Sequence, residues 1–186
     1  GVPVDIQHRR IVIERPGLFL AIIDEIISDD EHEYTPWYHF HPDLNIRRDT
    51  ATRLAVINEE GQKYCQIQCY DNDSNSIDHI ESKGQTAPNL QGWYSRNGRE
   101  LIENTALGFP LVGSSSMWAT VFDFNMRKTG KPYLRMGTGG KYLRFALTQE
   151  NNKVDVKIKI NKDETRSIEV EIDNSPVEVD IEFDEG

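Results

Sequence analysis

A short turn between two strongly apolar runs near the start of the chain constrains its fold most. Pro16-Gly17 separates residues 6–14 from residues 18–23, and the second run is apolar without a break. Proline fixes φ at the first central position of a type II turn, and glycine supplies the positive φ that the second position requires. Ile11 and Ile13 share one face of the first run. The sequence therefore predicts a β-hairpin with a half-buried first arm and a second arm covered on both faces.

A buried helix is the alternative for residues 18–23, but their short length and β-branched content favour a strand. Further strands are predicted at residues 33–41, 52–57, 62–70, 77–80, 118–125, 132–136 and 141–147. Between them we expect an acidic turn at residues 28–31, turns at 58–61, 71–76 and 137–140, a loop at 82–90, and a loop with short strand pieces at 101–117.

The end of the chain alternates apolar and charged residues over residues 153–160, 166–172 and 177–183. Such alternation predicts an antiparallel meander with one face toward a core and the other toward water. Lys157 and Lys159 lie on the outer face of one strand, and Glu169 and Glu171 on the outer face of the next. We expect these opposite charges to meet across the pair.

The predicted fold class is therefore all-β: an antiparallel β-sandwich, two-layered and supersandwich-like, with a C-terminal β-meander. A chain of 186 residues in this class fits one domain, residues 1–186. Residues 131–186 are a candidate for a smaller terminal sheet within it.

The formal net charge of −10 is spread along the chain. Nucleic acids and anionic membranes bind clustered Lys and Arg, so neither is an expected partner. The same charge makes the average surface a poor platform for an acidic polysaccharide, although the local basic pairs Arg9-Arg10 and Arg47-Arg48 could still serve. No apolar stretch approaches the roughly twenty residues of a membrane helix. Gly1-Val2-Pro3 opens directly into strand-like sequence without a signal peptide, which suggests an excised fragment of a longer protein.

Cys65 and Cys69 are the two cysteines of the chain. They lie four residues apart in an alternating run, and therefore on one face of a strand about 13 Å apart, which is too far for a disulfide between them. We predict two buried free thiols.

Two stretches carry a family resemblance. The first has His8-Arg9-Arg10 at the start of a strand, the hairpin into Leu-Phe-Leu-Ala-Ile-Ile-Asp-Glu, then His-Glu-Tyr and His-Phe-His-Pro, ending at Pro42. The second runs from Gln91 to Glu100 and is followed by a strand that begins at Trp118. In their order and spacing, these stretches resemble the C-terminal β-domain of the heparinase II/III-like polysaccharide lyases over about residues 6–125.

The resemblance implies a parent enzyme that cleaves uronic-acid polysaccharides by β-elimination. In such lyases the catalytic Asn, His and Tyr come mainly from an N-terminal α/α toroid that precedes the β-domain. No matching helical segment is present in this sequence, so no catalytic residue can be carried over to it. The implied partners are a polysaccharide and the toroid of the parent chain, and the resemblance favours a secreted, periplasmic or cell-surface location in a bacterium.

Five residues are candidates for contact with such a substrate: Trp37, His39, His41, Trp93 and Tyr94. The rings of Trp37, Trp93 and Tyr94 could stack on sugar faces. Packing within the domain is the alternative for each of them. For Trp93 and Trp118 it is the favoured interpretation, because large aromatic side chains are usually mostly buried.

His39 and His41 also raise the question of a metal. They lie on one side of a strand about 7 Å apart, close enough to ligate one Zn²⁺, but a third ligand such as Asp43 or His32 could be recruited only through the fold. The zinc element of the resembled family precedes its His-Arg-Arg hairpin, whereas His41 follows the hairpin here. We expect packed strand surface and no cofactor in this chain, with zinc a property of the full-length parent.

Two functions remain open. The chain is either the C-terminal β-sandwich of a heparinase II/III-like lyase, supporting or contacting the substrate rather than catalysing, or a stand-alone carbohydrate-binding or structural β-sandwich module. A helical toroid encoded upstream of this sequence would distinguish the two.

Overall fold

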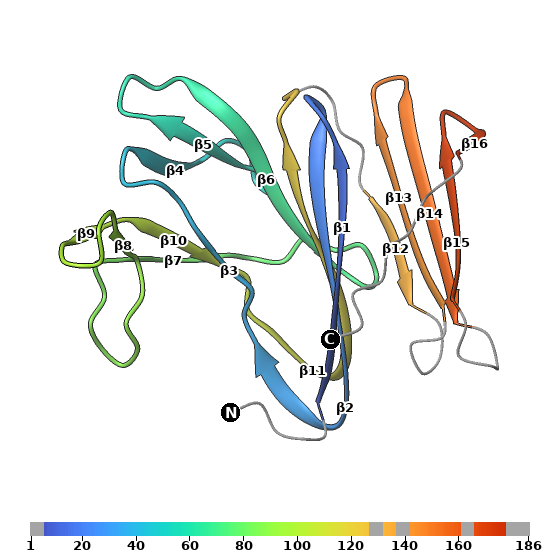
Figure 1. Ribbon diagram of the computed structural model, residues 1–186, viewed down its shortest axis with the longest axis horizontal. Helices are drawn as coiled ribbons and strands as arrows, with labels where there is room; N and C mark the ends of the chain where they lie inside the picture. Colours follow the sequence, from blue (N-terminus) through green and yellow to red (C-terminus); the bar gives the residue numbers. More distant parts are fainter. Residues whose placement is uncertain (1–5, 127–131, 137–141, 161–165, 178–186) are drawn as a thin grey trace. The chain divides into compact units, whose positions relative to one another are not determined.

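The computed structural model describes residues 6–126, 132–136, 142–160 and 166–177, and the regular structure of these residues consists of antiparallel β-strands (Figure 1). This confirms the predicted all-β, sandwich-like fold. The chain divides into two compact units. The first comprises Gly1–Asp71 and Asn75–Met126, and the second Asn72–Ser74 and Arg127–Gly186. Within the described residues, no helix is long and apolar enough to cross a membrane.

The first unit contains a six-stranded sheet in the order β1-β2-β11-β6-β5-β4. Its strands are β1 (Gln7–Arg15), β2 (Phe19–Tyr34), β11 (Leu111–Asp123), β6 (Lys63–Asp71), β5 (Leu54–Asn58) and β4 (Leu44–Arg48). The β1–β2 turn is the predicted one, because Leu18 N donates to Arg15 O over 2.9 Å and Gly17 has a φ of 72°. The strands predicted at residues 52–57 and 62–70, with the turn between them, are likewise present as the β5–β6 hairpin, with a positive φ at Gly61.

Burial along the first hairpin matches the predicted pattern. On edge strand β1, Ile11 and Ile13 are half-buried while Val12 is exposed. On β2, Leu20 and Ile22 pack against the main core cluster, which includes Trp118 and Phe122 of β11. The opposite side of β2 is buried as well, with Phe19, Ala21 and Ile23 all at 2 % exposure or less. The second arm is therefore covered on both faces.

Two predicted irregular segments are wrong. Residues 28–31 form no turn, because β2 continues to Tyr34 and its end pairs with β11 at His32↔Gly113, beyond a register shift between Gly113 and Ser115. Residues 101–117 are mostly strand: they hold β9 (Leu101–Glu103), β10 (Thr105–Gly108) and the first half of β11. In both places long-range pairing overrides the local preference of charged residues, Gly and Ser: it acts directly within residues 101–117, and on either side of residues 28–31, at Ile27↔Ser115 and His32↔Gly113.

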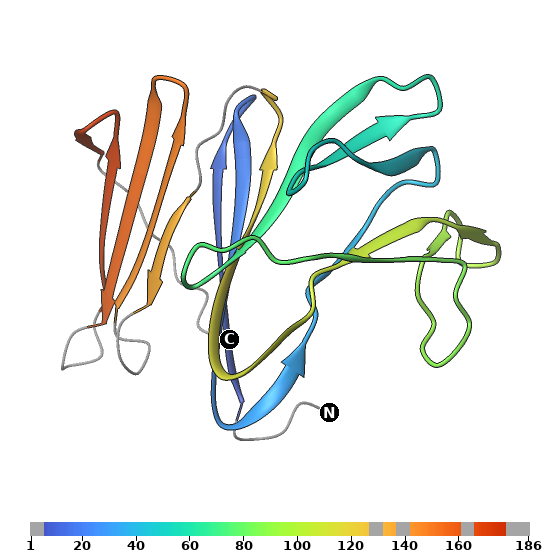
Figure 2. The same cartoon turned by 180° about the vertical axis from the view of Figure 1, so that it is seen from behind.

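A smaller sheet of the first unit has the order β3-β10-β7, with β3 (Trp37–His39) and β7 (Ile80–Lys83), and β8 (Trp93–Ser95) pairs with β9. Figures 1 and 2 show the β8–β9 hairpin beside the ends of β7 and β10. The short strand predicted at residues 77–80 is thus displaced to Ile80–Lys83. The turn predicted after β6 is present, because Asp71 Oδ1 accepts from Asn75 N over 2.7 Å.

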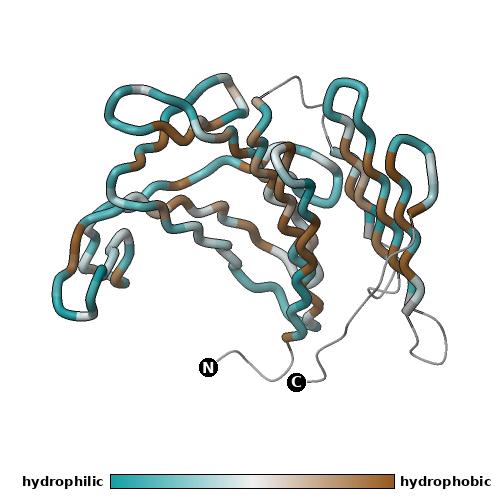
Figure 3. Tube along the Cα trace, turned by 45° about the horizontal axis from the view of Figure 1, so that its top comes forward, coloured by the Kyte–Doolittle hydropathy of each residue, from teal (hydrophilic) through white to brown (hydrophobic). Residues whose placement is uncertain are grey.

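The second unit is the predicted meander. Its sheet has the order β12-β13-β14-β15-β16, with β12 (Tyr133–Met136), β13 (Tyr142–Gln149), β14 (Asn152–Ile160), β15 (Arg166–Ile172) and β16 (Ser175–Val177). Apolar and polar residues alternate along its strands in Figure 3. One face is buried through residues such as Leu143, Phe145 and Val156. The turn predicted at residues 137–140 and most of the strand predicted at 177–183 lie outside the described residues.

Candidate functional site

The β3-β10-β7 sheet positions the first candidate residues. Trp37 lies opposite Gly108 in the β3–β10 register, and Trp37 is half-buried. A Cβ at Gly108 would lie 2.8 Å from Thr35 Cγ2 and 3.0 Å from the Trp37 ring. Trp37 therefore packs directly on the backbone of β10, and only glycine leaves room for it there.

Tyr38 points to the other face of β3 and fixes the orientation of its neighbours. Its ring makes edge contacts with Phe109 and Phe122, at centroid distances of 6.3 and 5.2 Å. Burial raises the pKa of the Tyr38 hydroxyl well above its usual value. Because successive side chains of a strand alternate, the inward Tyr38 turns His39 outward, and His39 is exposed.

His41 follows β3 and meets the β8–β9 hairpin. The His41 and Tyr94 rings contact each other edge to face, with their centroids 5.4 Å apart. Unprotonated, His41 Nδ1 can accept from Asp43 N over 3.3 Å; protonated, it can donate to Asp43 Oδ2 over 3.4 Å. The imidazole keeps 43 % of its surface exposed, so it is held at one edge and open to a ligand at another.

Gly92 docks the β8–β9 hairpin on the sheet. A Cβ there would lie within 3 Å of the backbone of Ser82, Lys83 and Asn104, and Gly92 has a φ of 73°. The Gly92 carbonyl accepts from Gly84 N and Asn104 N, over 3.0 and 2.9 Å. This close approach of backbone explains why the position needs glycine. The next residue is anchored too, because Trp93 Nε1 donates to Gln85 O over 2.9 Å.

Asn104 connects the two segments and was missed by the sequence reasoning. Its backbone N–H bonds to Gly92 next to β8, and its side-chain Nδ2 donates to Phe40 O over 2.6 Å next to His41. Asn104 is 2 % exposed, and within the described part of the chain its Oδ1 has no hydrogen-bond partner. A single Asn carries no local pattern, and its partner Phe40 is 64 residues away. Only the fold shows this role.

The five candidate residues do not form a single cluster. The structure brings His41 and Tyr94 into contact, places Trp37 and His39 on the same strand, and ties Trp93 to the loop at Gln85. Trp118 is a core residue at 3 % exposure, as expected. Over the described ranges, no group of three or more His, Cys, Asp and Glu is arranged to hold a metal ion. His39 and His41 therefore meet no third ligand there.

The Arg9-Arg10 pair is not an open basic patch. Arg9 pairs with the buried Glu25, and Arg10 with the buried Asp24, on opposite faces of the β1–β2 hairpin. Their guanidinium groups are committed to carboxylates of their own sheet. Arg47 and Arg48 at the end of β4 are exposed, and Arg48 donates to Ala51 O over 2.7 Å.

The sheets and this surface define an all-β domain that presents aromatic and imidazole side chains next to one another. The chain belongs to the family described as Heparinase II/III-like, C-terminal, which matches residues 3–114. It is similar to two solved structures named Heparinase III-BT4657 gene product, one of them with methylated lysines, at TM-scores of 0.61 and 0.60 and 16% identity. Each likeness covers 83% of this chain and 24% of the solved chain, and concerns the fold. No curated protein matches the chain.

Proposed function

We propose that this chain is the C-terminal β-domain of a lyase that cleaves uronic-acid polysaccharide by β-elimination, and that it contacts the polysaccharide while catalytic groups come from a preceding helical toroid. The observation that carries the proposal is the His41–Tyr94 pair on the surface of a domain from the heparinase II/III-like family. The chain spans about a quarter of the length of the structures it matches, which fits a part of a larger enzyme.

The chemistry of β-elimination supports this division of roles. The uronic carboxylate must be neutralised, a base must remove the C5 proton, and an acid must assist the leaving oxygen. His41 and Tyr94 offer an aromatic surface and one imidazole, which suit stacking and hydrogen bonding to a sugar ring. We expect the purified chain to release no unsaturated product from a uronic-acid polysaccharide. Ultraviolet absorbance of the product tests this, and its appearance would refute the non-catalytic role.

Binding tests the contact surface directly. We expect His41→Ala and Tyr94→Ala each to weaken binding of a heparosan oligosaccharide at least about fivefold, as for a residue central to an interface. Tyr64→Ala, at an exposed position of β6, and His79→Ala, in the segment after β6, change the same residue types elsewhere in the unit and should leave the affinity unchanged. Calorimetric titration measures all four. Equal effects of site and control variants would exclude this surface as the contact.

Asn104 provides a test of positioning. Asn104→Ala removes the bond to Phe40 O, so the segment before His41 loses its link to the hairpin of Tyr94. We expect the NMR shifts of the His41 ring, which lies against Tyr94, to move in this variant, and the oligosaccharide affinity to fall with them. An affinity loss without any change at the His41 ring would assign Asn104 a different role.

We further propose that zinc in the parent enzyme belongs to a part outside this chain. Among the described residues the two histidines lack a third ligand, and stable zinc sites use at least three protein ligands. Metal analysis of the purified chain should find no stoichiometric zinc, and chelator should not change the melting of the wild type or of His39→Ala. One zinc per chain that is lost on mutation of His39 would make His39 a ligand.

A further inference from the structure

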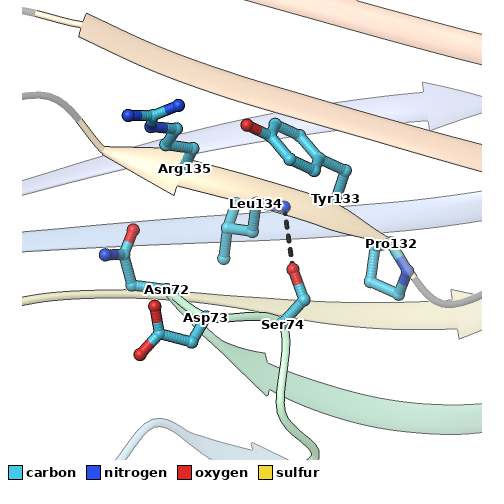
Figure 4. Close-up of a pocket in the computed structure, with 7 residues that line it drawn as sticks. All are labelled: Asn72, Asp73, Ser74, Pro132, Tyr133, Leu134 and Arg135. Atoms are coloured by element: carbon cyan, nitrogen blue, oxygen red, sulfur yellow. Dashed lines mark hydrogen bonds between the residues drawn. The ribbon is translucent and has the colours of Figure 1, made fainter.

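The second unit contains a pocket of about 670 Å³ at the β12 edge of its sheet (Figure 4). The residues that line it are Asn72, Asp73, Ser74, Pro132, Tyr133, Leu134 and Arg135. Leu134 N donates to Ser74 Oγ over 3.1 Å, and Pro132 has no N–H to satisfy. The Asn72–Ser74 segment thus protects edge strand β12 from pairing with another strand.

Strand alternation gives β12 one apolar and one polar face. Leu134 is 2 % exposed, whereas Tyr133 and Arg135 are exposed. In Figure 4 the Tyr133 and Arg135 side chains project from the side of β12 opposite to Leu134. An aromatic ring and a guanidinium group therefore stand two residues apart on the same open face.

The neighbouring strand adds a second guanidinium that is already engaged. Arg144 of β13 lies opposite Arg135 in the register, and its Nε donates to Asp155 Oδ1 over 2.9 Å. This bonding to Asp155 raises the pKa of Arg144. Arg144 also lies 5.1 Å from the centroid of the Tyr133 ring. Within the described ranges Arg135 has no ion pair, so its five donors stay available to a ligand.

The charge around Arg135 differs from that of the chain as a whole, whose net charge is −10. The described polar-face residues of β12 and β13 are Tyr133, Arg135, Tyr142, Arg144, Ala146 and Thr148, with no carboxylate among them. Asp155 is 2 % exposed beneath Arg144, and Glu169 and Glu171 pair with Lys157. Asp73 is the one carboxylate among the seven described lining residues.

We propose that this pocket is a second carbohydrate subsite, which takes an acidic sugar of the polysaccharide. Arg135 binds its carboxylate or sulfate group through two parallel N–H···O bonds, the geometry for which a guanidinium is suited. The exposed face of Tyr133 stacks on the sugar ring while Arg144 holds the ring in place. The subsite lies in the second unit and involves none of the His41–Tyr94 surface. It rests on the proposed function only for the choice of an acidic sugar.

Calorimetric titration with three probes tests the subsite: a heparosan oligosaccharide with carboxylates only, a heparin oligosaccharide with sulfates as well, and a neutral cello-oligosaccharide. We expect Arg135→Gln to weaken binding of an acidic probe about tenfold, as for a charged hydrogen-bonded contact. Arg135→Lys keeps the positive charge but cannot form two parallel hydrogen bonds, so its affinity should lie between those of the wild type and Arg135→Gln. Arg47→Gln removes the same charge from an exposed position of β4, and should leave binding unchanged.

The outcomes separate the ligand chemistries. Arg135-dependent binding of both acidic probes assigns the contact to the carboxylate, and dependence with heparin alone assigns it to sulfate. Asp73→Asn should raise the affinity, because it removes a like charge from the pocket; unchanged or lower affinity would overturn this placement of the anion. The subsite would be overturned if Arg135→Gln and Arg47→Gln had the same affinity for the acidic probes, or if the neutral probe bound the wild type as tightly as the acidic probes do. The subsite is also tested separately from the proposed function, by adding Arg135→Gln to the His41→Ala variant. The same fold loss of affinity there as in the wild type would show that the subsite does not depend on the His41–Tyr94 surface.

Discussion

Arg10 and Asp24 lie directly opposite each other on β1 and β2, with Arg10 Nε 2.7 Å from Asp24 Oδ1 and Nη2 3.2 Å from Oδ2. The two partners differ in exposure, because the Asp24 side chain is fully buried and that of Arg10 is 48% exposed. His8 Nε2 also lies 2.7 Å from Asp24 Oδ1. Strand β2 therefore carries a buried carboxylate, Asp24, whose partners lie on the neighbouring edge strand β1.

This difference in exposure predicts unequal effects of removing either partner. Arg10→Met leaves the buried Asp24 carboxylate with His8 alone, and should lower the free energy of unfolding by about 3 kcal/mol. Asp24→Asn leaves a guanidinium that water can solvate, and should cost only about 1 kcal/mol. Denaturant unfolding followed by Trp fluorescence reports on this unit. Equal losses of stability in the two variants would contradict the view that the buried Asp24 depends on Arg10 more than Arg10 depends on Asp24.

The double variant Arg10→Met/Asp24→Leu sharpens the same test. With both charges replaced by apolar side chains, no desolvated ion remains, and most of the loss caused by Arg10→Met should be recovered. Arg47→Met, at an exposed position of β4, is the control for loss of a surface guanidinium.

The two cysteines make a prediction about reactivity. Burial raises the pKa of the Cys65 and Cys69 thiols to about 12, and both are free and buried, as predicted. At pH 8 a thiol of that pKa is about 10⁻⁴ ionised, against about a quarter for an ordinary cysteine. A thiol-disulfide reagent should label the native protein very slowly and the unfolded protein at once. Rapid labelling of the native protein at pH 8 would show that Cys65 and Cys69 of β6 become accessible to the reagent in the folded state.

Local patterns account for what the sequence predicted well. The Pro16-Gly17 turn, the glycine-containing turn before β6 and the alternation of the terminal meander are each decided by a few adjacent residues. Residues 28–31 of β2 lie within a register shift, and the strand continues through them because the residues on either side, Ile27 and His32, pair with Ser115 and Gly113 of β11, some eighty residues later in the chain. The same holds for β10, whose extended conformation depends on β3 and β7 on either side.

In the candidate site, too, the sequence indicates residue types, whereas contacts between distant segments appear only in the fold. Residue type alone nominated His41 and Tyr94, but nothing in either segment indicates that the two rings meet. Asn104, which ties their segments together, lies where a loop with strand pieces was expected. Tyr133 and Arg135 form part of a pocket only because Asn72–Ser74, from a distant turn, lies along the edge of β12.

Asp155 predicts how the second unit responds to acid. The hydrogen bonds from Arg144 hold the pKa of the Asp155 carboxyl below its usual value of about 3.9. A lowered native pKa gives stability that is present above the unfolded pKa and is lost as the pH falls through the native value. Asp155→Asn should thus cost about 2 kcal/mol at neutral pH. The difference from wild type should shrink below about pH 4.

Hydrogen exchange of the β13 and β14 amides measures this effect within the unit concerned. Glu169→Gln changes an exposed acid of the same face and is the matched control, with a smaller expected effect at neutral pH. A destabilisation by Asp155→Asn that persists undiminished at pH 2 would mean that packing, not the ion pair, is lost.

Across β14 and β15, Lys157 Nζ lies 3.7 Å from Glu169 Oε2 and 3.8 Å from Glu171 Oε1, and Lys159 Nζ lies 3.7 Å from Glu169 Oε1. The predicted meeting of these charges is thus confirmed. Replacing both lysines by Glu puts like charges beside one another and should lower stability by up to about 2 kcal/mol at low salt. The loss should shrink with added salt, because exposed charges are screened over about 10 Å at 0.1 M.

A charge swap completes this last test. Adding Glu169→Lys and Glu171→Lys to the double lysine reversal restores opposite charges across the same strand pair, and should return most of the lost stability at low salt. Lys83→Glu, on an exposed position of β7, controls for the change in net charge. Hydrogen exchange of the β14 and β15 amides at two salt concentrations is the measurement. Exchange rates that stay the same in the reversal and in the swap would show that these side chains contribute no energy to the pairing of β14 with β15.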